Sequence, residues 1–147
     1  MIKRILAAVD GSAMSRRAVA YGAGIAKKFD AGLVLIYVIR DMQIPDGVRE
    51  VVEVSGFRTT RLTAMQTVGR QILDEFSSVA AEAGVARVEK VVRPGDPAGT
   101  ILRYATDNDI DLIVMGSRGL GEVESMLLGS VSRKVANLSK VACLTVK

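Results

Sequence analysis

The chain has 147 residues, of which 49% are hydrophobic and 4% aromatic, and its formal net charge at pH 7 is +4. This length predicts one domain, residues 1–147, with a core that needs no metal or disulfide. The sequence has a single cysteine, Cys143, and no histidine, which excludes an intramolecular disulfide, histidine-based triads and histidine metal sites.

The basic residues are scattered and are not interleaved with aromatic side chains, so we expect no nucleic-acid partner. No apolar stretch approaches the roughly 20 residues of a membrane helix. The apolar run near the N-terminus stops at Asp10. This run is too short for the hydrophobic region of a signal peptide. We therefore expect a cytoplasmic protein with no membrane partner.

Hydrophobic patterning predicts alternating strands and helices along the chain. Short continuous apolar runs are typical of strands that are buried on both faces of a parallel sheet, and apolar residues at helical spacing predict the connections. The predicted strands are residues 2–9, 33–38, 85–93, 112–115 and 141–146. The predicted helices are residues 13–29, 58–83, 97–107 and 130–139.

The segment 39–57 is the least regular part of the sequence, because it contains Pro45, Gly47 and several charges. It is long for a connection in a compact domain, so it is either a mobile lid or a partly helical insertion.

The alternation predicts an α/β fold with a single open five-stranded parallel sheet, Rossmann-like and doubly wound, with helices on both faces. Right-handed crossovers leave few topologies, and we expect the strand order 3-2-1-4-5. In that order the winding reverses between strands 1 and 4, and ligands bind outside the carboxyl ends of strands at such a switch point. The loops at Asp10–Ser12 and Gly116–Gly121 should therefore meet at one site.

A glycine- and serine-spaced segment follows the strand at 112–115. The strand ends at Gly116, and Gly129, Ser130, Val131 and Ser132 stand at the expected start of a helix. The first turn of a helix offers unpaired N–H groups and a partial positive charge, which favour phosphate. Glycine allows close approach of the backbone, and the serine hydroxyls could cap the helix or donate to phosphate. The alternative is a tight turn and a helix cap without a ligand.

Two charged side chains border the same loops. Asp10 could bind ribose hydroxyls or a magnesium ion that bridges phosphates, or it could equally bond the amides of its own turn. Arg118 could reach the phosphates, or it could be a solvated loop charge. Competing motifs fail their context: Gly22-Ala23-Gly24 lies inside a predicted helix, and no Gly-Lys-Ser/Thr of a P-loop exists.

The pattern Gly116-x2-Gly119-x9-Gly129-Ser130 resembles the ATP-binding signature of the universal stress protein family. The resemblance extends over essentially the whole chain and includes the segment ILAAVDGS, residues 5–12. It implies that ATP or AMP is bound, with Mg²⁺ held through the phosphates. It also implies that the backbone after Val38 reads the adenine and that Ala8 and Met115 line its pocket. Most relatives carry proline where this chain has Ala8, a departure that weakens packing against the base but removes no polar contact.

The resemblance further implies a homodimer through the edge strand from Val141 to Val146. The expected ligand-binding residues are Ala8, Asp10, Gly11, Ser12, Val38, Met115, Gly116, Arg118, Gly119, Gly129, Ser130, Val131 and Ser132. Asp10 is also the expected metal-facing carboxylate, and no catalytic residue is assigned.

Three functions fit these residues. The first is an adenine-nucleotide-binding module that acts in stress response or signalling. The second is a slow ATPase or nucleotidyl-transfer enzyme on the same fold, for which Asp10 is the one carboxylate expected near the phosphates. The third is a flavin-binding electron-transfer module. The absence of an evident activated nucleophile favours binding, with at most weak ATP hydrolysis.

Overall fold

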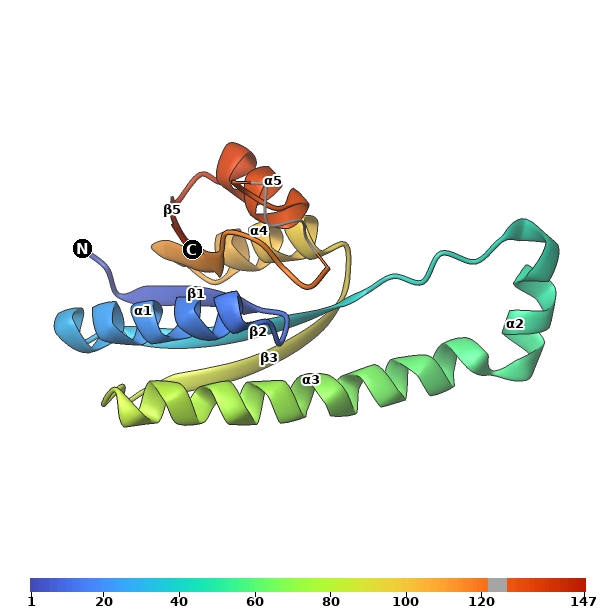
Figure 1. Cartoon of the computed structure of the whole chain (residues 1–147), viewed down its shortest axis with the longest axis horizontal. Coiled ribbons are helices and arrows are strands. Elements are labelled where there is room, and N and C mark those ends of the chain that lie inside the picture. Colours follow the sequence, from blue (N-terminus) through green and yellow to red (C-terminus); the bar gives the residue numbers. More distant parts are fainter. Residues whose placement is uncertain (122–126) are drawn as a thin grey trace.

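The computed structural model describes residues 1–121 and 127–147 (Figure 1). The strands are β1 (Arg4–Val9), β2 (Gly32–Arg40), β3 (Val88–Gly95), β4 (Leu112–Gly116) and β5 (Ala142–Val146). The helices are α1 (Ala13–Phe29), α2 (Arg49–Ser55), α3 (Phe57–Glu82), α4 (Pro97–Asp107) and α5 (Ser130–Leu138), with a 3-10 turn η1 (Asp46–Val48) before α2.

The five strands form one parallel sheet in the order β3-β2-β1-β4-β5. This confirms the predicted α/β fold class and strand order. The sheet is open, and β3 and β5 are its edges.

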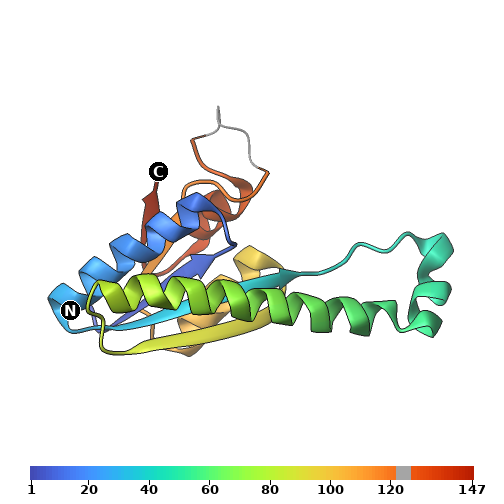
Figure 2. The same cartoon turned by 60° about the horizontal axis from the view of Figure 1, so that its bottom comes forward.

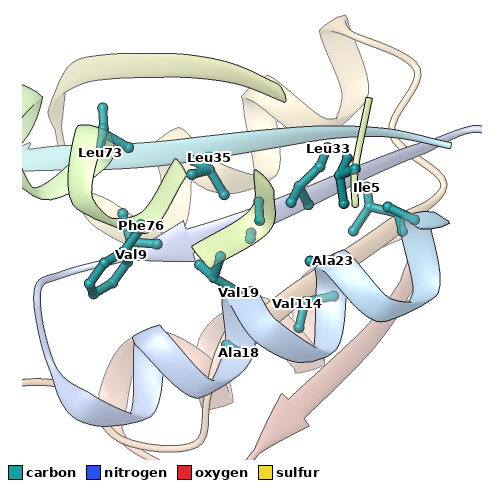
Figure 3. Close-up of a cluster of buried hydrophobic side chains, with 14 of the residues drawn as sticks. Ile5, Val9, Ala18, Val19, Ala23, Leu33, Leu35, Leu73, Phe76 and Val114 are labelled. Atoms are coloured by element: carbon teal, nitrogen blue, oxygen red, sulfur yellow. The ribbon is translucent and has the colours of Figure 1, made fainter. Parts of the chain in front are cut away.

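Two hydrophobic cores lie on opposite faces of the sheet, because successive side chains of a strand point to opposite sides. Along β2, Leu33 and Leu35 pack in the core beneath α1 and α3, and Val34 and Ile36 pack in the core beneath α4 and α5. Figure 3 shows Leu33 and Leu35 close to side chains of α1 and α3 in the first core. All four of these β2 residues are buried, which explains the continuous apolar run in the sequence.

Local capping signals determine where α1 and α4 begin. The Oγ of Ser12 accepts a hydrogen bond from the N–H of Ser15 at 3.1 Å, and a carboxylate oxygen of Asp96 accepts one from the N–H of Gly99 at 2.8 Å. Pro97 occupies the first turn of α4, where a missing N–H costs nothing. These contacts confirm the expected starts of both helices.

The segment 39–57 is partly helical, which is one of the two alternatives left by the sequence. β2 continues to Arg40, residues 41–45 form no helix or strand, and η1 and α2 follow. In both views α2 and the start of α3 lie well away from the sheet (Figures 1 and 2). We call residues 41–56 the arm.

The third strand begins later than predicted, at Val88 instead of residue 85. Val85 is buried in the core beneath α1 and α3, so its apolar character reflects core packing before the strand begins. The first pairing of β3 with β2 joins Val88 to Leu33. No helix in the described part of the chain is long and apolar enough to cross a membrane.

Asp111 ties together the amino ends of β1 and β4. Its Oδ2 accepts hydrogen bonds from the N–H groups of Lys3 and Arg4 at 2.7 and 3.0 Å, and its own N–H donates to the carbonyl of Arg4 at 2.9 Å. The two backbone donors, led by Lys3, hold the pKa of the Asp111 carboxyl below its ordinary value.

Replacing Asp111 by alanine is expected to lower the free energy of unfolding at pH 7 by about 1 kcal/mol. Because the folded pKa is the lower one, this contribution is complete above the unfolded pKa and is lost as the pH falls through the folded pKa. Urea unfolding of wild type and Asp111→Ala between pH 7 and acidic pH measures the difference. Asp41→Ala, an exposed site in the arm, is the control. A difference that stayed constant down to the lowest pH would contradict the assignment.

Candidate functional site

A cavity of about 290 Å³ opens at the carboxyl ends of β1, β2 and β4. Elements from both faces of the sheet contribute to it, together with the loop that follows β4. Its lining residues are Ala8, Val9, Asp10, Ser15, Ile36, Tyr37, Val38, Arg40, Arg61, Met65, Pro97, Ile101, Met115, Gly116, Arg118, Gly119, Leu120, Gly129, Val131 and Ser132.

Most of the residues expected from the sequence line this cavity. They are Ala8, Asp10, Val38, Met115, Gly116, Arg118, Gly119, Gly129, Val131 and Ser132. Gly11, Ser12 and Ser130 are not among the lining residues. Gly11 makes the turn after β1 with φ +85°, Ser12 caps α1, and Ser130 begins α5.

The carboxylate of Asp10 joins the loop after β1 to the loop after β4. Its Oδ1 accepts from the N–H of Ser12 at 2.9 Å, and its Oδ2 accepts from the N–H of Leu120 at 3.1 Å. Gly119 permits the second contact, because a Cβ at that position would lie 2.6 Å from Oδ2. Asp10 therefore has a structural role between the loops, and a role toward ribose or Mg²⁺ stays a prediction.

The start of α5 is held against the loop after β4. The N–H of Gly129 donates to the carbonyl of Ser117 at 2.6 Å, and the Oγ of Ser132 donates to the same carbonyl at 2.7 Å. The N–H of Ser117 in turn donates to the carbonyl of Val146 in β5 at 2.7 Å. The Ser132 hydroxyl is buried and fixes the loop, whereas the sequence suggested a helix cap or a phosphate donor. Gly129 is the N-cap of α5, and as a glycine it has no side chain that could accept a capping hydrogen bond.

One wall of the cavity is apolar and belongs to the core beneath α4 and α5. Its side chains come from β1, β2, β4 and the two helices, and they are Ala8, Ile36, Val38, Ile101, Met115 and Val131. An apolar wall beside a few polar groups is the usual environment of a bound small molecule. The loop after β4, residues 116–121, which we call the glycine loop, and the start of α5 also line the cavity, through Gly116, Gly119, Gly129 and Ser132.

Comparison with known proteins identifies the family. A family model described as the universal stress protein family matches residues 1–147. The chain belongs to this family. It is 35% identical to universal stress protein YxiE of Bacillus subtilis over 151 residues, an alignment that covers all of both chains.

Solved structures of similar proteins share the fold. The structure of hypothetical protein MJ0577 has a TM-score of 0.85 and 25% sequence identity, with 100% of this chain and 96% of that chain covered. A universal stress protein in complex with cAMP has a TM-score of 0.70 and 27% identity, with 99% and 96% of the two chains covered. Both the predicted family and the predicted fold are therefore confirmed.

In this universal stress protein, sequence reasoning missed several lining residues. Arg40 could have been found, because it lies two residues beyond Val38 on the same strand, and alternate residues share a face. Tyr37, Arg61 and Met65 gave no such signal. Arg61 and Met65 belong to α3, and no local pattern shows where that helix crosses the end of β2.

The cavity is lined by more positive than negative charge. Arg40, Arg61 and Arg118 line it, and among the lining residues within the described ranges 1–121 and 127–147 Asp10 is the only acidic one. None of the three arginines forms an ion pair in the described parts of the chain, residues 1–121 and 127–147. An arrangement of this kind favours an anionic ligand.

The hydroxyl of Tyr37 is influenced by both an acidic and a basic side chain of the cavity, Asp10 and Arg61. Burial raises the pKa of its hydroxyl above the ordinary value, the carboxylate of Asp10 raises that pKa further, and Arg61 partly opposes this increase. The phenol is therefore neutral at physiological pH and can donate or accept a hydrogen bond.

Proposed function

We propose that this universal stress protein binds an adenine nucleotide, ATP or AMP, in the cavity at the carboxyl ends of β1, β2 and β4. The observation that carries the proposal is the convergence of three kinds of surface on one cavity. The apolar wall suits a base, and the glycine loop next to the first turn of α5 suits phosphates. The carboxylate of Asp10 suits the hydroxyls of a sugar. A relative of 27% identity, solved in complex with cAMP, supports the proposal.

Different lining residues of the cavity would contact the base, the ribose and the phosphates of the nucleotide. The adenine would lie against Ala8, Val38 and Met115, with the backbone after Val38 reading its edge. The ribose would lie beside Asp10. The phosphates would approach the loop from Gly116 to Gly119 and the start of α5 at Gly129.

A magnesium ion fits this arrangement as a partner of the phosphates. Among the described residues no group of three or more acidic, histidine or cysteine side chains could hold a metal ion. Mg²⁺ is commonly bound by one or two carboxylates together with substrate phosphates. Among the described residues, Asp10 would be the carboxylate nearest to such an ion.

Titration calorimetry with ATP and with AMP, in the presence of Mg²⁺, tests the proposal. We expect saturable binding of one nucleotide per chain. Val38→Trp should fill the apolar side of the cavity and abolish binding, whereas Val68→Trp, at an exposed site on α3, should leave binding intact. Folded protein with no affinity for either nucleotide would overturn the proposal, and mass spectrometry of co-purifying molecules provides an independent test.

We further propose that nucleotide occupancy serves stress response or signalling, and that two copies associate through β5. In the described part of the chain this strand is a sheet edge whose one partner is β4, and Ala142 is exposed while Cys143, Leu144 and Thr145 are half-buried. An unpaired apolar edge invites a second strand. Sedimentation at micromolar protein should give the mass of a dimer, and a monomer would overturn this part of the proposal.

A further inference from the structure

The cavity crosses the end of the sheet, so that its lining belongs to both hydrophobic cores. Ala8 and Val38 pack against the core beneath α4 and α5, whereas their neighbours Val9 and Tyr37 belong to the core beneath α1 and α3. Alternation of side chains along β1 and β2 accounts for this division. The cavity therefore has a second part, lined by Tyr37, Arg61 and Met65, which we call the α3 compartment.

Two residues of α3 at four-residue spacing, Arg61 and Met65, form one wall of the α3 compartment. Arg61, Met65 and Gly69 share a face of the helix. Gly69 allows the ring of Tyr37 to pack directly on α3, because a Cβ there would lie 2.6 Å from Cδ1 of Tyr37. This packing places the ring next to the helix that carries Arg61.

Arg61 is the cationic group of the α3 compartment. Its side chain is half-buried, and no ion pair to it is found among the described residues. The nearby carboxylate of Asp10 already accepts two backbone hydrogen bonds, from Ser12 and Leu120. Guanidinium groups bind phosphate through paired, charge-assisted hydrogen bonds. A phosphate in the α3 compartment would therefore be a suitable hydrogen-bond acceptor for Arg61.

We propose that the α3 compartment binds a second phosphate group, carried on the 2′ or 3′ oxygen of the ribose. Arg61 is the side chain that binds this phosphate. This inference rests on the proposed nucleotide site. With the base on the α4 and α5 side and the 5′ phosphate at the glycine loop, the ribose lies beside Asp10 at the sheet end. Its 2′ and 3′ oxygens then face Tyr37 and Arg61. The ligand class is an adenosine bisphosphate.

Calorimetry at constant ionic strength tests this inference with three nucleotides: 5′-AMP, adenosine 2′,5′-bisphosphate and adenosine 3′,5′-bisphosphate. In wild-type protein at least one bisphosphate should bind about tenfold more tightly than AMP, the effect of one charge-assisted hydrogen bond. In Arg61→Gln this affinity ratio should fall towards one. Arg58→Gln removes a charge from the same helix at an exposed site outside the cavity, and should keep the wild-type ratio.

The outcomes separate the inference from the proposed function. AMP binding with no preference for either bisphosphate would overturn the α3 compartment as a phosphate site and leave the nucleotide site intact. A ratio that falls equally in Arg58→Gln would also overturn it, because general electrostatics would then explain the preference. Failure of every nucleotide to bind would overturn both. The isomer that binds more tightly identifies the ribose oxygen that faces Arg61.

Discussion

Replacing Gly116 by alanine is expected to weaken nucleotide binding by about tenfold or more and to lower the free energy of unfolding by about 1–3 kcal/mol. A Cβ at residue 116 would lie 2.8 Å from Cβ of Met14. It would also lie 3.1 Å from the backbone carbon of Met14 and 3.2 Å from the carbonyl oxygen of Arg118. Backbone atoms cannot yield as a flexible side chain does, so the loop after β4 must move. That loop provides the proposed phosphate contacts.

Urea unfolding and nucleotide titration measure the two effects of Gly116→Ala. The matched control is Gly24→Ala in α1, where a Cβ would meet nothing within 4 Å. The control should raise the free energy of unfolding by about 0.5–1 kcal/mol, because alanine is the better helix former, and should not change nucleotide affinity. Wild-type affinity in Gly116→Ala would show that the loop geometry does not matter for binding.

Replacing Asp10 by alanine is expected to lower the free energy of unfolding by about 1–3 kcal/mol and to weaken nucleotide binding. The substitution leaves the N–H groups of Ser12 and Leu120 without their acceptors, and it disconnects the loops after β1 and β4. Asp10→Asn keeps one carbonyl oxygen as an acceptor, so its destabilisation should be smaller. Thermal or urea unfolding of the two variants beside wild type measures this order.

The same variants separate the binding role of Asp10 from a chemical one. A structural carboxylate predicts that affinity and stability fall together in Asp10→Ala and recover together in Asp10→Asn. Equal stability of both variants and wild type would contradict the bridging role. ATP turnover in wild type that Asp10→Asn abolishes, while nucleotide binding persists, would instead assign the slow ATPase function.

Local signals in the sequence were sufficient for most of the fold. The bounds of α1 follow from the cap at Ser12 and from the break after Phe29, where Asp30 adopts a left-handed conformation with φ 51°. The buried strands are recognisable in the sequence as continuous apolar runs, because helices cover both faces of the sheet. The strand order follows from the alternation and the handedness of crossovers, and it places the two polar loops at one end of the sheet.

Hydrophobic patterning did not predict the structure of segments that have no regular packing against neighbouring helices or strands. The arm has exposed apolar residues such as Val51 and Val54, so it carries no stripe directed at a core. Val85 looked like the start of a strand because burial in a core and burial in a sheet leave the same apolar signal.

The sequence by itself determined the parallel sheet, its order and the meeting of the glycine loop with Asp10. Only the tertiary structure decided that Asp10 bonds Leu120, that Ser132 holds Ser117, and that Arg61 reaches the cavity beside Tyr37. The physical reason is distance along the chain. Periodicity and caps act over a few residues, whereas these contacts depend on how α3, α5 and the loops pack on the finished sheet.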